Sequence, residues 1–137
     1  MSQPFSLLVK PASADCNLRC SYCFYLDHSA FYPDERIHRM SEETLERMVK
    51  SYMQTDQPQY AFGWQGGEPT LMGVDFFRKA VEFQRRYGHP GAVVGNGLQT
   101  NGVLIDDELA RLLAEYHFLV GVSVDGPPEI HNHYRRN

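Results

Sequence analysis

The chain has 137 residues, of which 42% are hydrophobic and 22% charged, and this suits one globular domain or part of one. A formal net charge of −4 provides no basic footprint, so we expect no nucleic-acid partner. The apolar run Leu7–Val9 is too short for a signal peptide or a membrane span, so we expect no membrane association. Cysteines in a chain without an export signal suggest a reducing compartment, and the sequence predicts a cytoplasmic protein.

The first predicted element is a short buried strand over residues 5–10, and the segment with all three cysteines follows it. A helix then begins at Ser41, with Glu42 and Glu43 in the first turn, where carboxylates interact favourably with the helix dipole. Its apolar residues recur at the spacing of one buried helix face. They are Leu45, Met48, Val49, Tyr52 and Met53.

Three strands and two helices are predicted in the rest of the chain. A strand over residues 60–65 precedes a helix that begins near Asp75 and has Gly88 as its C-cap. The next strand covers residues 98–100, with Val93 as an alternative start, and a helix from near Asp106 leads to a strand over residues 118–124. The residues expected to face inward from these two helices are Phe76, Phe77, Ala80, Val81, Phe83, Leu109, Leu112, Leu113 and Tyr116.

Regular alternation of strand and helix predicts an α/β fold with a parallel sheet and right-handed crossovers. About four strands and three helices would make either a small doubly wound domain or half of a barrel. In both folds ligands bind at the carboxyl ends of the strands, so we expect the segments that follow the strands to converge there. These segments are residues 16–23, Gln65–Pro69, Gln99–Gly102 and Ser123–Gly126.

The three cysteines, Cys16, Cys20 and Cys23, form a CxxxCxxC pattern. Three thiolates can hold three irons of a [4Fe–4S] cluster and leave the fourth iron open to a small molecule. The odd number argues against a disulfide framework. Structural zinc stays open, because His28 could complete a Cys3His site. A redox CxxC is also present at Cys20 and Cys23, but it would leave Cys16 unused.

Several polar or small residues at the strand ends are candidates for ligand binding. Gly66 and Gly67 would let a ligand approach the backbone, although an ordinary turn has the same composition. The Glu68 carboxylate could accept bonds from an ammonium group. Ser123 and Asp125 could bind a ribose or a carboxylate, or simply end the strand in a local turn.

Aromatic residues flank the last cysteine. Tyr22 and Tyr25 could stack on a nucleobase or shield a cluster from water, and packing within the loop is an equally good interpretation. Trp64 lies inside a predicted strand, and we expect it to face the core.

The cysteine pattern, with an aromatic residue before its third cysteine, and the later Gly66-Gly67-Glu68-Pro69 together resemble the core of radical S-adenosylmethionine enzymes. Four longer runs resemble anaerobic sulfatase-maturating enzymes in particular: KPASADCNLRCSYCFYL, WQGGEPTL, LQTNG and VSVDGPPEIHN. The resemblance covers essentially all 137 residues. Enzymes of that family oxidise a Ser or Cys of a sulfatase to Cα-formylglycine.

The resemblance implies two cofactors, a [4Fe–4S] cluster and S-adenosyl-L-methionine. Cys16, Cys20 and Cys23 would ligate the cluster, whose open iron would chelate the methionyl amino and carboxylate groups. Reductive cleavage of the sulfonium would give a 5′-deoxyadenosyl radical that takes hydrogen from Cβ of the target residue. The implied cofactor-binding residues are Tyr22, Tyr25, Gln65, Gly66, Gly67, Glu68, Ser123 and Arg135. The implied partners are a sulfatase or other peptide substrate and a low-potential electron donor.

The family has a six-stranded partial TIM barrel, so we expect residues 1–137 to be the N-terminal portion of a radical S-adenosylmethionine core domain. We expect the family's auxiliary-cluster domain to be absent and its catalytic Asp base to lie beyond this chain, and we assign no catalytic residue. Whether the chain alone is an enzyme is left open. The alternatives are an inactive cluster-binding remnant and a maturase of another peptide, such as a thioether-forming enzyme.

Overall fold

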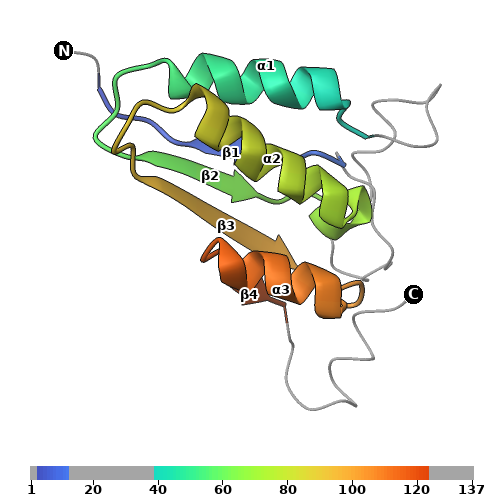
Figure 1. Ribbon diagram of the computed structural model, residues 1–137. Helices are drawn as coiled ribbons and strands as arrows, with labels where there is room; N and C mark the ends of the chain where they lie inside the picture. The colour runs from blue at the N-terminus through green and yellow to red at the C-terminus, as the bar shows by residue number, and fades with distance from the viewer. Residues whose placement is uncertain (1–2, 13–38, 124–137) are drawn as a thin grey trace.

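The structure is a computed structural model that describes residues 3–12 and 39–123. Within these ranges strands alternate with helices, as predicted (Figure 1). In chain order the elements are β1 (Leu7–Val9), α1 (Glu42–Met53), β2 (Tyr60–Trp64), the 3-10 helix η2 (Pro69–Met72), α2 (Val74–Tyr87), β3 (Val94–Thr100), α3 (Asp107–Glu115) and β4 (Leu119–Val122). The sequence did not predict η2, which follows directly after Glu68.

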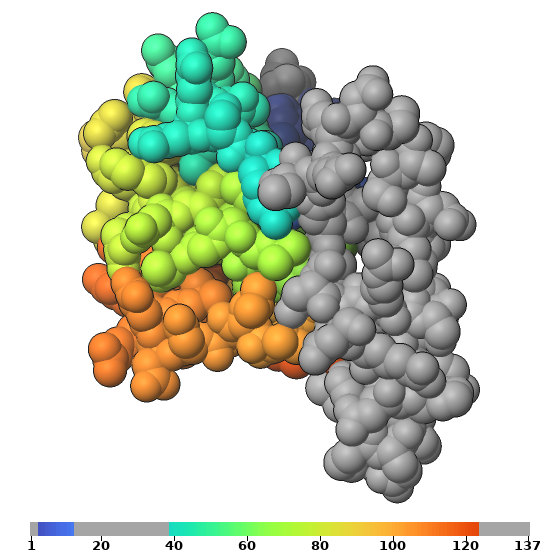
Figure 2. Space-filling model, turned by 90° about the vertical axis from the view of Figure 1, so that its right-hand side faces the viewer, coloured from blue at the N-terminus to red at the C-terminus, as the bar shows by residue number. Residues whose placement is uncertain are grey.

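All strand pairs in the described sheet are parallel, and the strand order is β1-β2-β3-β4. The helices lie on one face of this sheet, and α2 packs between α1 and α3 (Figures 1 and 2). A doubly wound sheet would reverse its strand order and carry helices on both faces, whereas a barrel wall keeps consecutive strands adjacent and its helices outside. The described residues therefore form part of a barrel wall.

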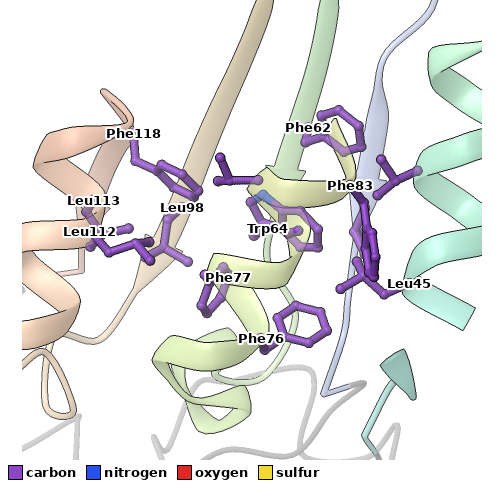
Figure 3. Close-up of a cluster of buried hydrophobic side chains, with 14 of the residues drawn as sticks. Leu45, Phe62, Trp64, Phe76, Phe77, Phe83, Leu98, Leu112, Leu113 and Phe118 are labelled. Atoms are coloured by element: carbon purple, nitrogen blue, oxygen red, sulfur yellow. The ribbon is translucent and has the colours of Figure 1, made fainter. Parts of the chain in front are cut away.

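The core lies between the sheet and the three helices. Alternate residues of β2, namely Tyr60, Phe62 and Trp64, are buried against the helices. The Trp64 ring meets Phe76 and Phe77 edge-on, with centroid distances of 5.7 and 5.8 Å (Figure 3). Full burial of one large apolar side chain contributes roughly 1.5–3 kcal/mol, so this cluster helps to attach α2 to the sheet. The prediction that Trp64 faces the core is confirmed.

Local signals in the sequence explain where the helices begin. Ser41 Oγ accepts a hydrogen bond from Thr44 N (3.1 Å), and the Asp106 carboxylate accepts one from Leu109 N (2.9 Å), as expected of N-caps. Gly88 is the C-cap of α2, as predicted, with a φ of −78°. A Cβ at this position would lie 2.8 Å from the Gln84 carbonyl oxygen, so close packing explains the glycine here.

The strand boundaries differ from the predictions. β1 forms a ladder with β2 over only three residues, because the backbone N of Phe5 instead donates to Gln57 Oε1 (3.1 Å). β3 begins at Val94, close to the alternative start, and β4 ends at Val122. Within the described ranges, no helix combines the length and apolar character needed to cross a membrane.

Candidate functional site

The face of the sheet that the helices leave uncovered carries an open cavity of about 400 Å³. The centre of its floor carries no side chains, because Gly63 and Gly97 are register partners there, and their partners on the two sides are Leu8 and Leu119. The residues that line the cavity are Gly63, Gln65, Gly97, Leu98, Gln99, Leu119, Val120 and Gly121.

Packing among the described residues does not account for the glycine at position 97 of this floor, or for Gly95, which precedes it on the same face of β3. Among residues 3–12 and 39–123, a Cβ at Gly95 would have no other atom within 4 Å, and a Cβ at Gly97 would meet only the Leu119 carbonyl oxygen, at 3.8 Å. Side chains at these positions would instead extend into the open space on this face. The floor is thus a cradle that side chains would fill, and this fits a ligand that lies flat on the sheet.

Backbone hydrogen bonds join the carboxyl ends of the strands in two neighbouring pairs. Gln65 N donates to Val9 O (2.8 Å) and joins the ends of β2 and β1. Ser123 N donates to Thr100 O (3.0 Å) and joins the ends of β4 and β3. The described parts of the segments predicted to converge therefore do lie at one edge.

Many of the sequence-predicted site residues lie outside the described residues. These are Cys16, Cys20, Cys23, Tyr22, Tyr25, His28, Asp125 and Arg135. Among residues 3–12 and 39–123, no group of three or more His, Cys, Asp or Glu side chains comes together to hold a metal ion. The cysteine-based cluster site therefore stays a prediction.

The Gly66-Gly67 turn connects β2 to the 3-10 helix. Gly66 has a φ of 115°, a conformation that side chains disfavour, and this accounts for a glycine at that position. Gly67 is half-buried, and Gln65 before the turn is exposed. The turn thus presents backbone atoms at the same edge as Ser123.

Glu68 follows the turn and is buried, with only 1% of its surface exposed. Its Oε2 accepts hydrogen bonds from Thr100 Oγ1 (2.6 Å), from Thr70 N (3.1 Å) and from the Thr70 hydroxyl. Its Oε1 accepts a hydrogen bond from Asn101 N (2.8 Å). The carboxylate therefore links the loop after β2 to the end of β3.

Ser123 is held by Gln99, a contact that the sequence did not reveal. Gln99 Nε2 donates to Ser123 Oγ (2.9 Å). A Cβ at Gly121, the register partner of Gln99, would overlap the Gln99 amide, so the glycine lets this side chain lie across β4. Because Ser123 Oγ is the acceptor in this bond, its O–H proton can be donated to another group, such as a carboxylate.

Two shifts in pKa concern neighbouring residues, Arg86 and Tyr87, that are remote from the strand ends. Tyr87 Oη, at the end of α2, donates to Glu46 Oε2 of α1 (2.7 Å), and this hydrogen bond raises the pKa of the phenol. Arg86 also contacts Glu46, and its pKa is raised, mainly by the hydrogen bond to Tyr87. These groups join two helices on the outer surface and do not belong to the candidate site.

Consecutive parallel strands, helices on one face and a cavity on the other define an α/β barrel-type fold, a class in which ligands bind at the carboxyl ends of the strands. Residues 11–137 match the Radical SAM superfamily, and the chain belongs to this superfamily.

Two relatives illustrate the similarity. The chain is 48% identical over 134 residues to the cysteine-type anaerobic sulfatase-maturating enzyme of Clostridium perfringens (strain ATCC 13124), a match that covers 98% of this chain and 36% of the relative. It is 42% identical over 137 residues to the serine-type enzyme of Bacteroides thetaiotaomicron, which covers 99% of this chain and 33% of the relative. The chain thus spans about a third of the length of these curated relatives.

The fold is similar to that of solved structures of the same kind. Native anSMEcpe with bound AdoMet gives a TM-score of 0.89 at 48% identity, covering 98% of this chain and 36% of that chain. The same protein with bound AdoMet and Cp18Cys peptide gives 0.88 at 47% identity, covering 98% and 35%. The predicted resemblance and the predicted partial-barrel fold are confirmed.

Proposed function

We propose that the chain is part of a radical S-adenosylmethionine enzyme of anaerobic sulfatase maturation, which oxidises a Ser or Cys of a sulfatase to formylglycine. One observation carries this proposal, namely where the cysteine-bearing segment joins the fold. Residues 13–38 contain all three cysteines, and the described chain on either side of them is closed by a hydrogen bond from Met40 N to Pro11 O (2.7 Å). This bond lies just after β1, on the carboxyl side of the sheet, where Gly66 and Ser123 also lie.

The described residues fit S-adenosylmethionine in two respects. The glycine floor leaves room for a flat group such as a nucleoside, and the edge beside it supplies backbone atoms at Gly66 and Gly67 and a hydroxyl at Ser123. The methionyl part of the molecule carries an amino group and a carboxylate, which need acceptors and donors of this kind. Three thiolates in CxxxCxxC spacing likewise suit a cluster with one open iron.

When bound, the cluster and S-adenosylmethionine would supply the reductive radical chemistry needed to remove hydrogen from Cβ of the target residue. The chain's own residues would bind and orient these groups. The thiolates of Cys16, Cys20 and Cys23 would ligate three irons. The residues that would contact S-adenosylmethionine are Tyr22, Tyr25, Gln65, Gly66, Gly67, Ser123 and Arg135. The closed face of the sheet behind the cavity would exclude water from one side of the site.

The peptide substrate is proposed from the relatives, which are sulfatase-maturating enzymes, and from the peptide-bound solved structure. Both a cysteine-type and a serine-type enzyme are similar to this chain over almost its whole length. We therefore propose a Ser or Cys target without choosing between them. A low-potential electron donor would reduce the cluster.

The test is anaerobic reconstitution of the full chain with iron and sulfide. We expect about four irons and four sulfides per chain. We also expect a change in the electron paramagnetic resonance spectrum of the reduced cluster on adding S-adenosylmethionine, and formation of 5′-deoxyadenosine with excess reductant. The Cys20→Ser variant is the matched control and should lose the cluster. Bound zinc without sulfide would refute the proposal, and a cluster that yields no 5′-deoxyadenosine would indicate an inactive remnant.

A further inference from the structure

The carboxylate of Glu68 is buried and accepts four hydrogen bonds from its own chain. An ionised carboxylate offers about four acceptor sites on two oxygens. Four donors bind this carboxylate: the backbone N and hydroxyl of Thr70 and the hydroxyl of Thr100 at Oε2, and the backbone N of Asn101 at Oε1. With only 1% of its surface exposed, Glu68 has no opening through which the ammonium group of a ligand could reach it.

The donors come from two segments that are distant in the sequence. Thr70 belongs to η2, two residues after Glu68, whereas Thr100 and Asn101 lie 32 and 33 residues away at the end of β3. Both threonines are buried, with 4% and 2% of their surface exposed. The hydrogen bonds therefore join the Gly66-Gly67 turn, which directly precedes Glu68, to the central strand of the candidate site.

The connection continues from β3 to β4. Thr100 Oγ1 donates to Glu68 and also accepts a hydrogen bond from Gly102 N (3.0 Å), which shapes the turn after β3. The carbonyl oxygen of Thr100 accepts a hydrogen bond from Ser123 N (3.0 Å). Thr100 thus connects the turn after β2 to the residue after β4, although its own side chain is buried among the helices and does not line the cavity.

We propose that Glu68 is a positioning residue and that Thr100 is its partner. Together they fix the backbone of the Gly66-Gly67 turn at the distance from Ser123 that S-adenosylmethionine requires. This inference rests on the proposed function and gives Glu68 a different part in it from the direct ligand contact that the sequence predicted. Hydrogen bonds to an ionised acceptor are about twice as strong as those between neutral groups. The hydrogen bonds of Glu68 can therefore hold in place a glycine turn that would otherwise be flexible.

The decisive variant is Thr100→Val, which removes the hydroxyl but keeps the shape of a buried side chain. Because Thr100 does not line the cavity, any loss of affinity for S-adenosylmethionine in this variant must come from a change in the position of the Gly66-Gly67 turn. With the reconstituted full chain and no reductant, we expect the Kd for S-adenosylmethionine to rise at least about ten-fold while iron content is unchanged. Thr100→Ser keeps the hydroxyl and should stay close to the parent. Glu68→Gln should weaken binding as well, because an amide nitrogen would face one of the donors.

A control variant separates positioning from general loss of stability. Val49 is fully buried in α1, so Val49→Thr makes the reverse exchange of the same two side chains in a different part of the core. It should destabilise the protein and leave the Kd unchanged. Hydrogen exchange at the Asn101 amide gives a readout that needs no cofactor, and Thr100→Val and Glu68→Gln should both increase its rate in the full chain.

The possible results distinguish the two proposals. If the parent binds S-adenosylmethionine and Thr100→Val binds it equally well despite faster exchange at Asn101, the positioning role is wrong. If Glu68→Gln alone loses affinity, Glu68 contacts the ligand directly and the positioning role is also wrong. If the parent fails to bind S-adenosylmethionine at all, the proposed function fails, and the positioning role fails with it.

Discussion

Gly97 offers a test of whether the open face of the sheet binds a ligand, because packing among the described residues does not require a glycine there. Within residues 3–12 and 39–123, a Cβ at this position would meet only the Leu119 carbonyl oxygen, at 3.8 Å, which is an ordinary contact. Replacing glycine by alanine at a compatible backbone conformation usually stabilises a protein by about 0.4–1 kcal/mol, because it reduces the entropy of the unfolded chain. For a domain of this size, that raises the melting temperature by roughly 2–6 °C.

The same substitution should harm ligand binding. The added methyl group would occupy the floor of the cavity, and Gly97→Val, which suits a strand, would occupy more of it. We expect Gly97→Ala to raise the Kd for S-adenosylmethionine at least about ten-fold, or about 1.4 kcal/mol, and Gly97→Val to abolish measurable binding. Stability and affinity would then change in opposite directions.

The assay pairs thermal unfolding with calorimetric titration of S-adenosylmethionine into the reconstituted full chain. Gly88→Ala is the matched control, because a Cβ there would lie 2.8 Å from the Gln84 carbonyl oxygen and 3.0 Å from Met53 Cε. That crowding should cost about 1–3 kcal/mol of stability and leave the affinity of the folded protein unchanged. Unaltered affinity in Gly97→Val would refute the assignment of the ligand to this face.

Three further predictions concern individual contacts. Gly121→Ala should displace the Gln99 amide from Ser123. We expect this to weaken binding of S-adenosylmethionine more than binding of its decarboxylated analogue, as measured by titration of both ligands. Equal losses of affinity would contradict a carboxylate contact at Ser123. Asp106→Ala should cost about 1 kcal/mol in urea unfolding, because it removes the N-cap of α3, and a cost near zero would contradict the cap. Trp64→Phe should cost about 1–3 kcal/mol in the same assay, because it removes both volume and the indole hydrogen bond, and an unchanged midpoint would contradict its packing.

The sequence predicted the order and type of most elements because they depend on local patterns. The apolar spacing of α1 and the helix starts at Ser41 and near Asp106 follow from residues that are close together in the sequence, and the structure confirms them. The boundaries of β1 and β4 were less predictable, because a strand ends where its partner's ladder ends, and the partner is distant in the sequence. The choice between a doubly wound sheet and a barrel wall also depends on the order of the strands in the sheet, which the amino-acid composition does not predict.

At the candidate site, the segments were predictable but the contacts were not. Parallel strands place their carboxyl ends at one edge, so Gly66 and Ser123 could be expected to approach each other. The four donors on Glu68 depend on the register between β2 and β3, which only the structure supplies. Gln99 could have been suspected, because it alternates with the buried Leu98 and Thr100 and must therefore face the open side.

The Gly66-Gly67-Glu68-Pro69 motif can be explained by backbone geometry before any ligand is considered. Gly66 adopts a φ of 115°, Glu68 anchors the turn to β3, and Pro69 occupies the start of η2, where its fixed φ suits a helix and its missing N–H is not needed. The Glu68 and Pro69 side chains are both buried, so neither points at the cavity. The motif is therefore suited to presenting backbone atoms in a fixed place, and the side chains that select a ligand must come from its neighbours, among which Gln65 and Ser123 lie at this edge.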